Sequence, residues 1–302
     1  MLGDLPFVSV IIPVYKGSAF LPQCLAALDK QDYPPQRFEI LIVFNGGGPT
    51  CVVADSTRSP MRCLEELIPG SYAARNQGIL HATGTVLAFT DVDCVPDPAW
   101  LRTGVQALTA NPGCGFVGGN IELVPKSPER LSPAERYEKS IHFLQQTYIN
   151  QLHFAATANM FTTREVMDCV GRFRQDLKSG GDREWGTRAA SLGFLGFYEP
   201  EAVVRHRTRT VGELLRKARR LAGGVLDRHR LEQRPEITGI RGFVFDWKEE
   251  RSFFRGSGSL LRASNGMGAI EDMSLGLLSF LIFGVRVMER WLIRLGAKSL
   301  RG

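Results

Sequence analysis

Residues 86–97 read Val-Leu-Ala-Phe-Thr-Asp-Val-Asp-Cys-Val-Pro-Asp, an apolar run that ends in two carboxylates one residue apart. The apolar run predicts a buried strand, and the Asp and Pro residues after it predict a loop. Because side chains two residues apart in an extended chain point the same way, Asp91 and Asp93 can offer oxygens to one cation. Mg²⁺ and Mn²⁺ prefer such oxygens and leave other positions for water and phosphate. The alternative is a surface turn without a metal.

The sequence around this motif alternates between predicted strands and predicted helices. Apolar, β-branched runs predict strands at 7–13, 39–44 and 85–89. Helical spacing of apolar residues and flanking turn residues predict helices at 19–31 and 71–81. Repetition of strand, helix and strand favours an α/β sheet with mostly parallel strands, and such sheets bind ligands at the carboxyl ends of the strands.

The composition is that of an ordinary globular chain, with one large domain and an appendage or with two domains. The chain has 302 residues, of which 44% are hydrophobic and 23% are charged. Its six cysteines are scattered without a C-x-x-C pair, and no signal peptide is recognised before the first predicted strand. We interpret the cysteines as small core or loop residues, and their pattern favours a reducing, cytosolic compartment.

Positive charge is concentrated between Arg205 and Arg234, where ten basic residues accompany three acidic ones. This segment therefore carries +7, whereas the rest of the chain carries −1. Such a stretch suits an anionic partner, either phosphate, acidic lipid headgroups or nucleic acid, and the alternative is a solvated helix face. No aromatic-rich RNA motif or helix-turn-helix signature accompanies the arginines, so we expect no nucleic-acid partner.

Two common nucleotide-binding motifs are absent, because no G-x-G-x-x-G follows the first strand and no G-x-x-x-x-G-K-[ST] loop occurs. Other short motifs follow one another in order, at 8–15, 74–78, 82–84, 91–93, 96–101, 171–173 and 179–184. Through these motifs, the chain from about Phe7 to about His206 resembles the inverting glycosyltransferases of family 2. The resemblance implies a GT-A fold, which is a Rossmann-like, mostly parallel sheet flanked by helices, here with a C-terminal helical extension.

The resemblance also implies a nucleotide-diphosphate sugar as donor, bound with Mn²⁺ or Mg²⁺ across the strand ends. Asp93 would be the direct metal ligand, and Asp91 would lie nearer the ribose or a metal-bound water. A divalent cation suits this chemistry because negative charge develops on the departing diphosphate. Arg75 would add a second positive group, unless it is a solvated helix residue. UDP is the family's commonest nucleotide, and GDP and dTDP are the alternatives.

Inversion requires a carboxylate that takes the proton of the acceptor hydroxyl as the new bond forms. The resemblance assigns this role to Asp182, although Gly181 stands where the family commonly has glutamate. Gly181 would leave backbone room for the acceptor. Glu184 is the rival base or an acceptor-binding group. Asp182 would also suit the N-cap of a helix over 183–192.

The remaining candidate residues follow from the same resemblance or from their chemistry. Asn45 replaces an aspartate that typically contacts the nucleotide base, and an amide can still bond to a base edge. Pro13 and Tyr15 either line the same pocket at the end of the first strand or only pack there. Three other residues have expected roles: His206 as a third metal ligand or a structural residue, Asn159 close to donor and acceptor, and Trp185 stacking on the acceptor or buried in the core.

We expect a catalytic domain over 1–208 and a basic helical region over 209–302. In the second region, residues 211–221 have the apolar stripe of an amphipathic helix. The charge-free run 273–285 is shorter than the ~20 residues that span a bilayer, and basic residues follow it. A helix in the membrane interface, with those basic residues toward anionic headgroups, fits this pattern. The alternative is a helix docked on the catalytic domain.

The sequence therefore predicts a metal-dependent, inverting glycosyltransferase of the hexosyltransferase type. Transfer of a single sugar is favoured because the Q-x-x-R-W signature of processive synthases is absent. The acceptor would be a hydroxyl of a glycan or a lipid-linked saccharide in cell-envelope polysaccharide biosynthesis, reached from the cytoplasm or from the cytoplasmic face of the membrane. Two alternatives are a sugar-nucleotide-binding protein without activity, and an anion- or nucleic-acid-binding protein that uses residues 205–234.

Overall fold

The chain divides into two compact units. The computed structural model describes residues 5–15, 19–47, 58–111, 113–231, 233, 241–242, 244–245, 247–248 and 269–298. The first unit comprises Met1–Glu122, Leu144–Asp176 and Gly181–His206, and the second comprises Leu123–Phe143, Leu177–Gly180 and Arg207–Gly302. The second unit thus begins close to the predicted boundary, but it also includes two segments that we had placed in the catalytic domain.

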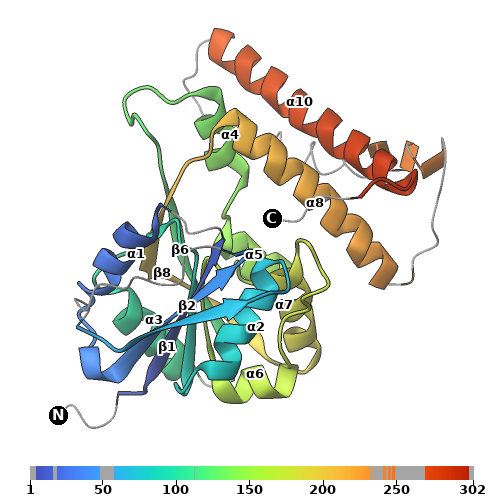
Figure 1. The fold of residues 1–302 in the computed structure, drawn as a ribbon. Helices are drawn as coiled ribbons and strands as arrows, with labels where there is room; N and C mark the ends of the chain where they lie inside the picture. The colour runs from blue at the N-terminus through green and yellow to red at the C-terminus, as the bar shows by residue number, and fades with distance from the viewer. Residues whose placement is uncertain are drawn as a thin grey trace. The chain divides into compact units, whose positions relative to one another are not determined.

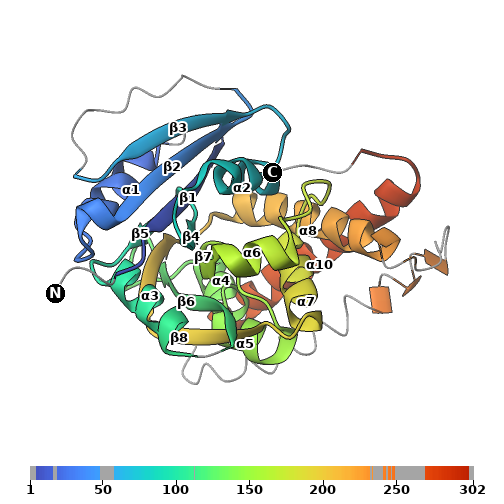
Figure 2. The same ribbon diagram turned by 90° about the horizontal axis from the view of Figure 1, so that it is seen from below.

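An eight-stranded sheet is the frame of the first unit (Figure 2). The strands lie in the order β3-β2-β1-β4-β7-β6-β8-β5. Their bounds are β1 Val8–Tyr15, β2 Phe38–Asn45, β3 Met61–Glu66, β4 Val86–Thr90, β5 Cys94–Pro96, β6 Cys114–Val124, β7 Asn159–Thr163 and β8 Leu195–Arg207. Strand β1 pairs in parallel with β2 and β4, and β2 pairs in parallel with β3, whereas β4–β7, β6–β7 and β5–β8 are antiparallel pairs. The parallel half of the sheet, β3-β2-β1-β4, contains the strand ends at which we predict ligand binding. The sequence did not predict the antiparallel pairs in the other half.

Helices flank the sheet, and one of them matters most for the site. Helix α2 packs against β1, β2 and β3, and it covers the range predicted for it (Figure 1). The helices of the first unit are α1 Leu21–Leu28, the 3₁₀ turn Pro35–Arg37, α2 Ser71–His81, α3 Trp100–Ala110, α5 Gln145–Leu152, α6 Arg164–Val170 and α7 Gly181–Ser191. The predicted α/β class is therefore confirmed.

The cysteines differ from the prediction at one position. Cys24, Cys94, Cys114 and Cys169 are free thiols. Cys63 on strand β3 is disulfide-bonded, so our interpretation of all six cysteines as small core or loop residues is wrong for Cys63. Because a disulfide bond oxidises a pair of cysteines, the cysteine pattern no longer argues for a reducing compartment.

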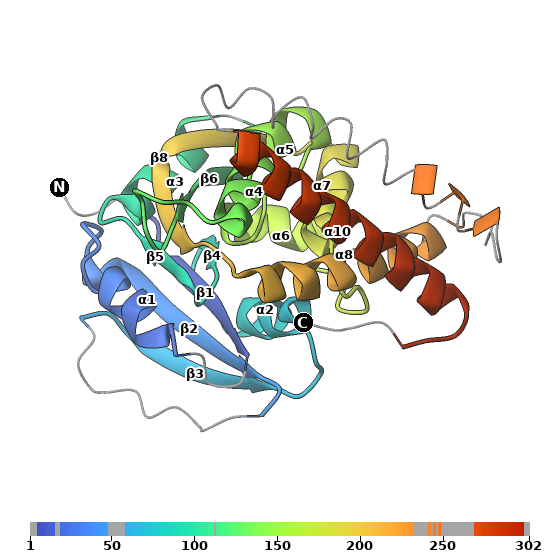
Figure 3. The ribbon, with the colours of Figure 1, turned by 90° about the horizontal axis from the view of Figure 1, so that it is seen from above.

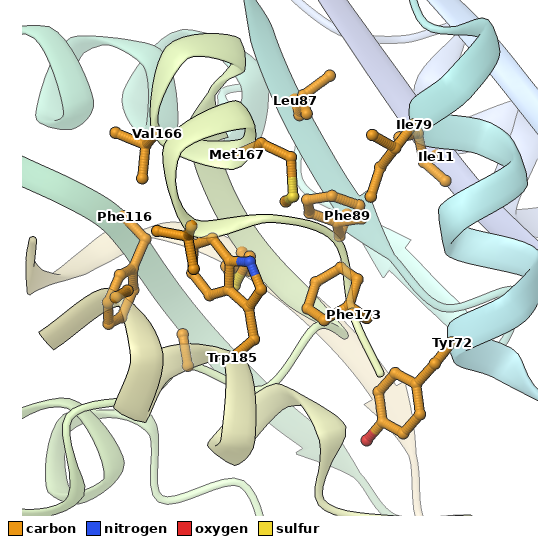
Figure 4. Close-up of a cluster of buried hydrophobic side chains, with 14 of the residues drawn as sticks. Ile11, Tyr72, Ile79, Leu87, Phe89, Phe116, Val166, Met167, Phe173 and Trp185 are labelled. Atoms are coloured by element: carbon orange, nitrogen blue, oxygen red, sulfur yellow. The ribbon is translucent and has the colours of Figure 1, made fainter. Parts of the chain in front are cut away.

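Five aromatic residues pack with aliphatic ones in the core between the sheet and helices α2, α6 and α7 (Figure 4). The rings of Phe89 and Phe173 meet edge to face with centroids 5.6 Å apart, and those of Phe116 and Trp185 do so at 5.8 Å. Tyr72 lies at the edge of this cluster, 5.9 Å from Phe173, and its hydroxyl points away from the other rings. The core therefore holds the Tyr72 ring in place and leaves its hydroxyl available for a polar partner.

The second unit includes helices α4 Pro133–Ile141, α8 Val211–Leu231 and α10 Ala269–Arg294. Helix α10 packs along α8 and α4 (Figure 3). The contact buries Leu275, Leu278 and Ile282 of α10 against Leu214 and Ala218 of α8. Among the described residues, no helix is both long enough and apolar enough to cross a bilayer.

Carboxylates of α4 and α10 balance part of the basic segment. Glu138 of α4 is fully buried and pairs with Arg209 at 2.5 Å and with Lys217 at 3.8 Å. Glu289 of α10 accepts a hydrogen bond from Arg219 at 2.7 Å. These basic residues hold helices together rather than forming a uniformly solvated face.

Candidate active site

The two carboxylates of the D-x-D motif lie in the turn between β4 and β5. The backbone N–H of Cys94 donates to the carbonyl of Asp91 at 3.0 Å, which closes this turn. Arg75 from helix α2 donates to Asp91 Oδ1 at 2.5 Å, and the arginine itself is buried. The alternative of a solvated Arg75 is therefore wrong, because its guanidinium is buried and held against Asp91.

Asp93 faces a histidine from strand β8, which is distant from it in the sequence. The antiparallel pairing of β5 with β8 places Cys94 opposite His206. His206 is fully buried, and its Nε2 lies 3.3 Å from Asp93 Oδ2. Donor atoms of Asp93, Cys94 and His206 all lie within 4.8 Å of one another. Carboxylate oxygen and imidazole nitrogen are suitable ligands for a divalent cation, so the residues present fit a metal at this position.

Asp182 lies in the first turn of helix α7, which begins at Gly181, so the residue is not the N-cap as predicted. Its Oδ1 accepts hydrogen bonds from the Arg183 backbone at 3.0 Å and from the Tyr72 hydroxyl at 3.3 Å. Desolvation raises the pKa of Asp182 above its usual range, and these two hydrogen bonds and the charge of Arg75 oppose that rise. A carboxylate of raised pKa in contact with a hydroxyl is typical of a general base.

Helix α2 connects the two acidic positions. Tyr72 and Arg75 are three residues apart and therefore lie on one face of the helix. The arginine is 5.8 Å from the centroid of the Tyr72 ring. Tyr72 contacts Asp182, and Arg75 contacts Asp91. The sequence analysis missed Tyr72, although its spacing from Arg75 was a signal that could have identified it.

Gly181 does not provide room for an acceptor. A Cβ atom at this position would lie only 2.7 Å from Cε2 of Tyr72. The prediction is therefore wrong, because the Tyr72 ring occupies the space that the missing side chain leaves. A glutamate here, as is common in the family that the chain resembles, would displace Tyr72 from Asp182.

Asn45 supports the start of helix α2. Its amide group donates to the carbonyls of Glu66 and Ile68 at 2.8 and 2.7 Å, and its Oδ1 accepts from the Gly70 backbone at 2.8 Å. Both amide hydrogens are thus used inside the protein, and the side chain is buried. The structure gives Asn45 a positioning role, and the predicted contact with a nucleotide base would have to use the remaining acceptor capacity of Oδ1.

Two predicted acceptor-binding residues are buried in the protein interior, so these predictions are wrong. Asn159 is 0% exposed, and its side chain bonds to the carbonyls of Asn120 and Ala202 and to the Trp100 indole. Trp185 is 1% exposed, and its indole N–H donates to the Gly171 carbonyl at 2.8 Å. Neither side chain presents a polar group or an aromatic face to a ligand.

Glu184 points to another side of helix α7 than Asp182, because residues two apart in a helix are about 200° apart around its axis. Its carboxylate is paired with Arg188 through bonds of 2.7 and 3.1 Å. Arg188 also donates to the carbonyls of Val170 and Arg172. Glu184 therefore belongs to a structural ion pair, and the structure does not bring it together with Asp182.

Pro13 and Tyr15 lie at the carboxyl end of β1, next to the end of β2. Tyr15 is 49% exposed, and its ring lies against Gly46, where a Cβ would be 2.6 Å from Tyr15 Cε2. Gly46 has a φ of +88°, which favours glycine. An exposed aromatic ring at this edge can stack on a planar ligand, and the role of both residues stays a prediction.

Comparison with known proteins identifies relatives of this chain. The sequence profile described as Glycosyl transferase family 2 matches residues 9–171. Glycosyltransferase AglE of Haloferax volcanii is 38% identical over 229 residues, which are 74% of each chain. The dolichyl N-acetyl-alpha-D-glucosaminyl phosphate 3-beta-D-2,3-diacetamido-2,3-dideoxy-beta-D-glucuronosyltransferase of Methanococcus voltae is 23% identical over 226 residues, or 68% of each chain.

A solved structure shares the fold. It is the mannosyltransferase PcManGT from Pyrobaculum calidifontis in complex with GDP-Man and Mn²⁺, and it matches with a TM-score of 0.56 and 18% identity. The likeness covers 97% of this chain and 86% of that chain. It shows the architecture, so the expected GT-A fold is confirmed.

Proposed function

The chain belongs to glycosyl transferase family 2 and is a glycosyltransferase, and on this basis we propose that it transfers one sugar, with inversion, from a nucleotide-diphosphate sugar to a hydroxyl acceptor. One observation carries the proposal. Tyr72 and Arg75, on one face of α2, contact the half-buried carboxylate Asp182 and the D-x-D residue Asp91, respectively. The arrangement aligns a candidate base with a candidate diphosphate site, as a single displacement requires.

The diphosphate site would be formed by Asp93, His206, Asp91 and Arg75. A divalent cation bound by Asp93 and His206 would supply positive charge to the departing diphosphate. Asp91 is already paired with Arg75, which leaves Asp93 as the carboxylate that faces His206. The Mn²⁺ and GDP-Man in the complex of the structural relative support a cation and a nucleotide sugar here. Mn²⁺ or Mg²⁺, and UDP, GDP or dTDP, remain the candidates.

In the proposed step, Asp182 takes the proton of the acceptor hydroxyl. As that oxygen bonds to the anomeric carbon, the bond from this carbon to the diphosphate oxygen breaks, and the electron pair leaves with the diphosphate. Arg75, buried beside Asp91, attracts the charge that develops on the leaving group. The hydrogen bond from Tyr72 orients the carboxylate of Asp182.

A donor screen tests this proposal. We expect hydrolysis or transfer from at least one member of a panel of UDP-, GDP- and dTDP-sugars, dependent on Mn²⁺ or Mg²⁺, with an anomeric configuration in the product opposite to that of the donor. NMR of the anomeric proton reads the configuration. A product with retained configuration would contradict the mechanism, and no turnover or binding of any donor would contradict the function.

Tyr72→Phe should move the acid limb of the pH profile to higher pH. Tyr72 donates to Asp182 and so lowers its pKa, and loss of this bond lets desolvation raise that pKa further. Because the base must be ionised, kcat/KM should then begin to fall at a higher pH than in the wild type as the pH is lowered. At pH values well above the pKa of Asp182, kcat/KM should change less. An unchanged limb with a uniformly lower rate would indicate that Tyr72 only packs.

We propose further that helix α10 attaches the enzyme to a membrane surface, where a lipid-linked acceptor would be found. Every exposed residue of α10 between 273 and 294 is apolar or glycine. Leu277 and Phe280 are 70% and 62% exposed, and Met273, Leu281, Met288 and Leu292 extend the same face. Arg290, one of the basic residues expected to face the headgroups, is buried instead. The proposed contact is therefore apolar, as in a helix that lies in the interface plane.

Replacing Leu277 and Phe280 together by glutamate should release the protein from lipid vesicles. Burial of each side chain contributes about 1.5–3 kcal/mol, so the partition coefficient should fall by more than about tenfold. Flotation with phosphatidylcholine and phosphatidylglycerol vesicles measures it. Leu80→Glu is the control, because Leu80 is 58% exposed but lies on α2. Equal binding of the double variant and the wild type, or no binding by the wild type, would contradict the proposal.

A further inference from the structure

The proposed metal site contains a thiol that the proposed sugar transfer does not require. We propose that Cys94 joins Asp93 and His206 as a third protein donor and gives the enzyme a binding site for Zn²⁺ in the absence of nucleotide sugar. This inference rests on the metal site of the proposed function and deepens it, because it concerns which cations that site takes.

Two strands and one turn bring the donors together. Cys94 is the first residue of β5, Asp93 precedes it in the turn after β4, and the β5–β8 register places His206 directly opposite Cys94. A carboxylate oxygen of Asp93, Cys94 Sγ and a ring nitrogen of His206 lie within 4.8 Å of one another. Ligands of one tetrahedral ion are about 3–4 Å apart at the bond lengths usual for zinc, so small side-chain movements would complete the site.

The three donor atoms of Asp93, Cys94 and His206 distinguish zinc from the cations of the transfer reaction. Mg²⁺ and Mn²⁺ prefer oxygen ligands, whereas a thiolate and an imidazole favour Zn²⁺. One sulfur, one nitrogen and one oxygen donor leave a fourth tetrahedral position for water or for a diphosphate oxygen. Binding would replace the thiol proton of Cys94 by the metal ion and release that proton to solvent. Zn²⁺ should therefore bind without the donor and compete with Mn²⁺ for Asp93.

Burial of Cys94 could instead reflect packing alone, since a free cysteine behaves as a small hydrophobic residue. Cys24 provides the comparison within the same chain. It is also a buried free thiol near the D-x-D turn, with Sγ 4.0 Å from the Asp91 carbonyl, but it does not belong to the three-residue donor cluster. Burial near the carboxylates is common to both thiols, and only Cys94 also lies close to His206.

Co²⁺ binding to the full chain without nucleotide tests the proposal, because thiolate ligation of Co²⁺ produces a ligand-to-metal charge-transfer band in the near ultraviolet. We expect this band in the wild type and in Cys24→Ser, its loss in Cys94→Ser, and its displacement by Zn²⁺. A Cys169→Ser background removes the exposed thiol. Competition with a chromophoric chelator should show that Zn²⁺ affinity falls about 100-fold or more in Cys94→Ser, the upper end of losses seen for outer-shell partners.

Circular dichroism shows whether Cys94→Ser folds. If it does not fold, His206→Asn serves as a second variant, which keeps the Cys94 thiol. It should weaken Zn²⁺ binding to a similar extent. Absence of the band in the wild type, or its persistence in folded Cys94→Ser, would overturn the inference. A wild type that turns over a donor with Mn²⁺ but lacks the band would refute zinc binding alone and leave the proposed function intact.

Discussion

Asp182→Asn should abolish most turnover while leaving donor binding intact. The amide is nearly isosteric and can still accept hydrogen bonds from Tyr72 and the Arg183 backbone, but it cannot take a proton. Loss of a general base typically costs 10²- to 10⁴-fold in rate, which is about 3–5 kcal/mol of barrier. We expect kcat to fall by about that factor, measured by nucleotide release, and the dissociation constant of the donor to change less than about threefold.

Glu184→Gln is the matched control for this prediction. Glu184 is a carboxylate on the same helix, two residues away, and its partner is Arg188 rather than Tyr72. This variant should keep kcat within a few-fold of the wild type, although it should unfold at a lower temperature because the ion pair is lost. If Glu184→Gln were inactive and Asp182→Asn active, the base would be Glu184. If both were active, the proposed mechanism would be wrong.

Asp93→Asn should have the second large effect, on cation and donor binding together. Asp93 provides the carboxylate that faces His206 at 3.3 Å, whereas the Asp91 carboxylate is already paired with Arg75. A neutral amide is a much weaker ligand for a hard divalent cation. Mn²⁺ affinity in the presence of nucleotide diphosphate, read by electron paramagnetic resonance of free Mn²⁺, should fall about 100-fold or more, and kcat/KM should fall at least in proportion.

Asp97→Asn controls for general effects of removing a charge from this loop. Asp97 is also in the segment after β4, but its carboxylate is paired with Arg205. Its replacement should leave Mn²⁺ affinity within about threefold of the wild type. The Mn²⁺ affinity of Asp91→Asn should lie between those of Asp93→Asn and Asp97→Asn, because this substitution releases Arg75 from its partner without removing the direct metal ligand. Wild-type Mn²⁺ affinity in Asp93→Asn would contradict the proposed site.

Sequence reasoning was most successful where the signal is local. The apolar run before Asp91 is a buried strand, and the helix over 71–81 has the predicted bounds. Strand β3 was missed, since half of the residues in Met61–Glu66 are charged and the strand lies at the edge of the sheet. Helix α10 extends well beyond the apolar run that indicated it, because its other turns contain charged residues that the search for apolar residues excluded.

The wrong predictions share a physical cause. Trp185 and Asn159 match motif positions in the sequence, but the tertiary structure surrounds both with core partners that use their polar groups. Gly181 has no side chain, yet the space this creates is filled by Tyr72, which is more than a hundred residues away in the chain. Residue type indicates what a side chain can do, and only its neighbours decide whether a ligand can reach it.

The amino-acid sequence by itself determined the family, the alternation of strands and helices, and the three carboxylates at Asp91, Asp93 and Asp182, because each depends on residues close together in the chain. The tertiary structure decided how these carboxylates differ. Asp91 pairs with Arg75, Asp93 faces His206, and Asp182 is desolvated beside Tyr72. Strand register and helix packing bring distant side chains together, and the charge and solvation of each carboxylate follow from those contacts.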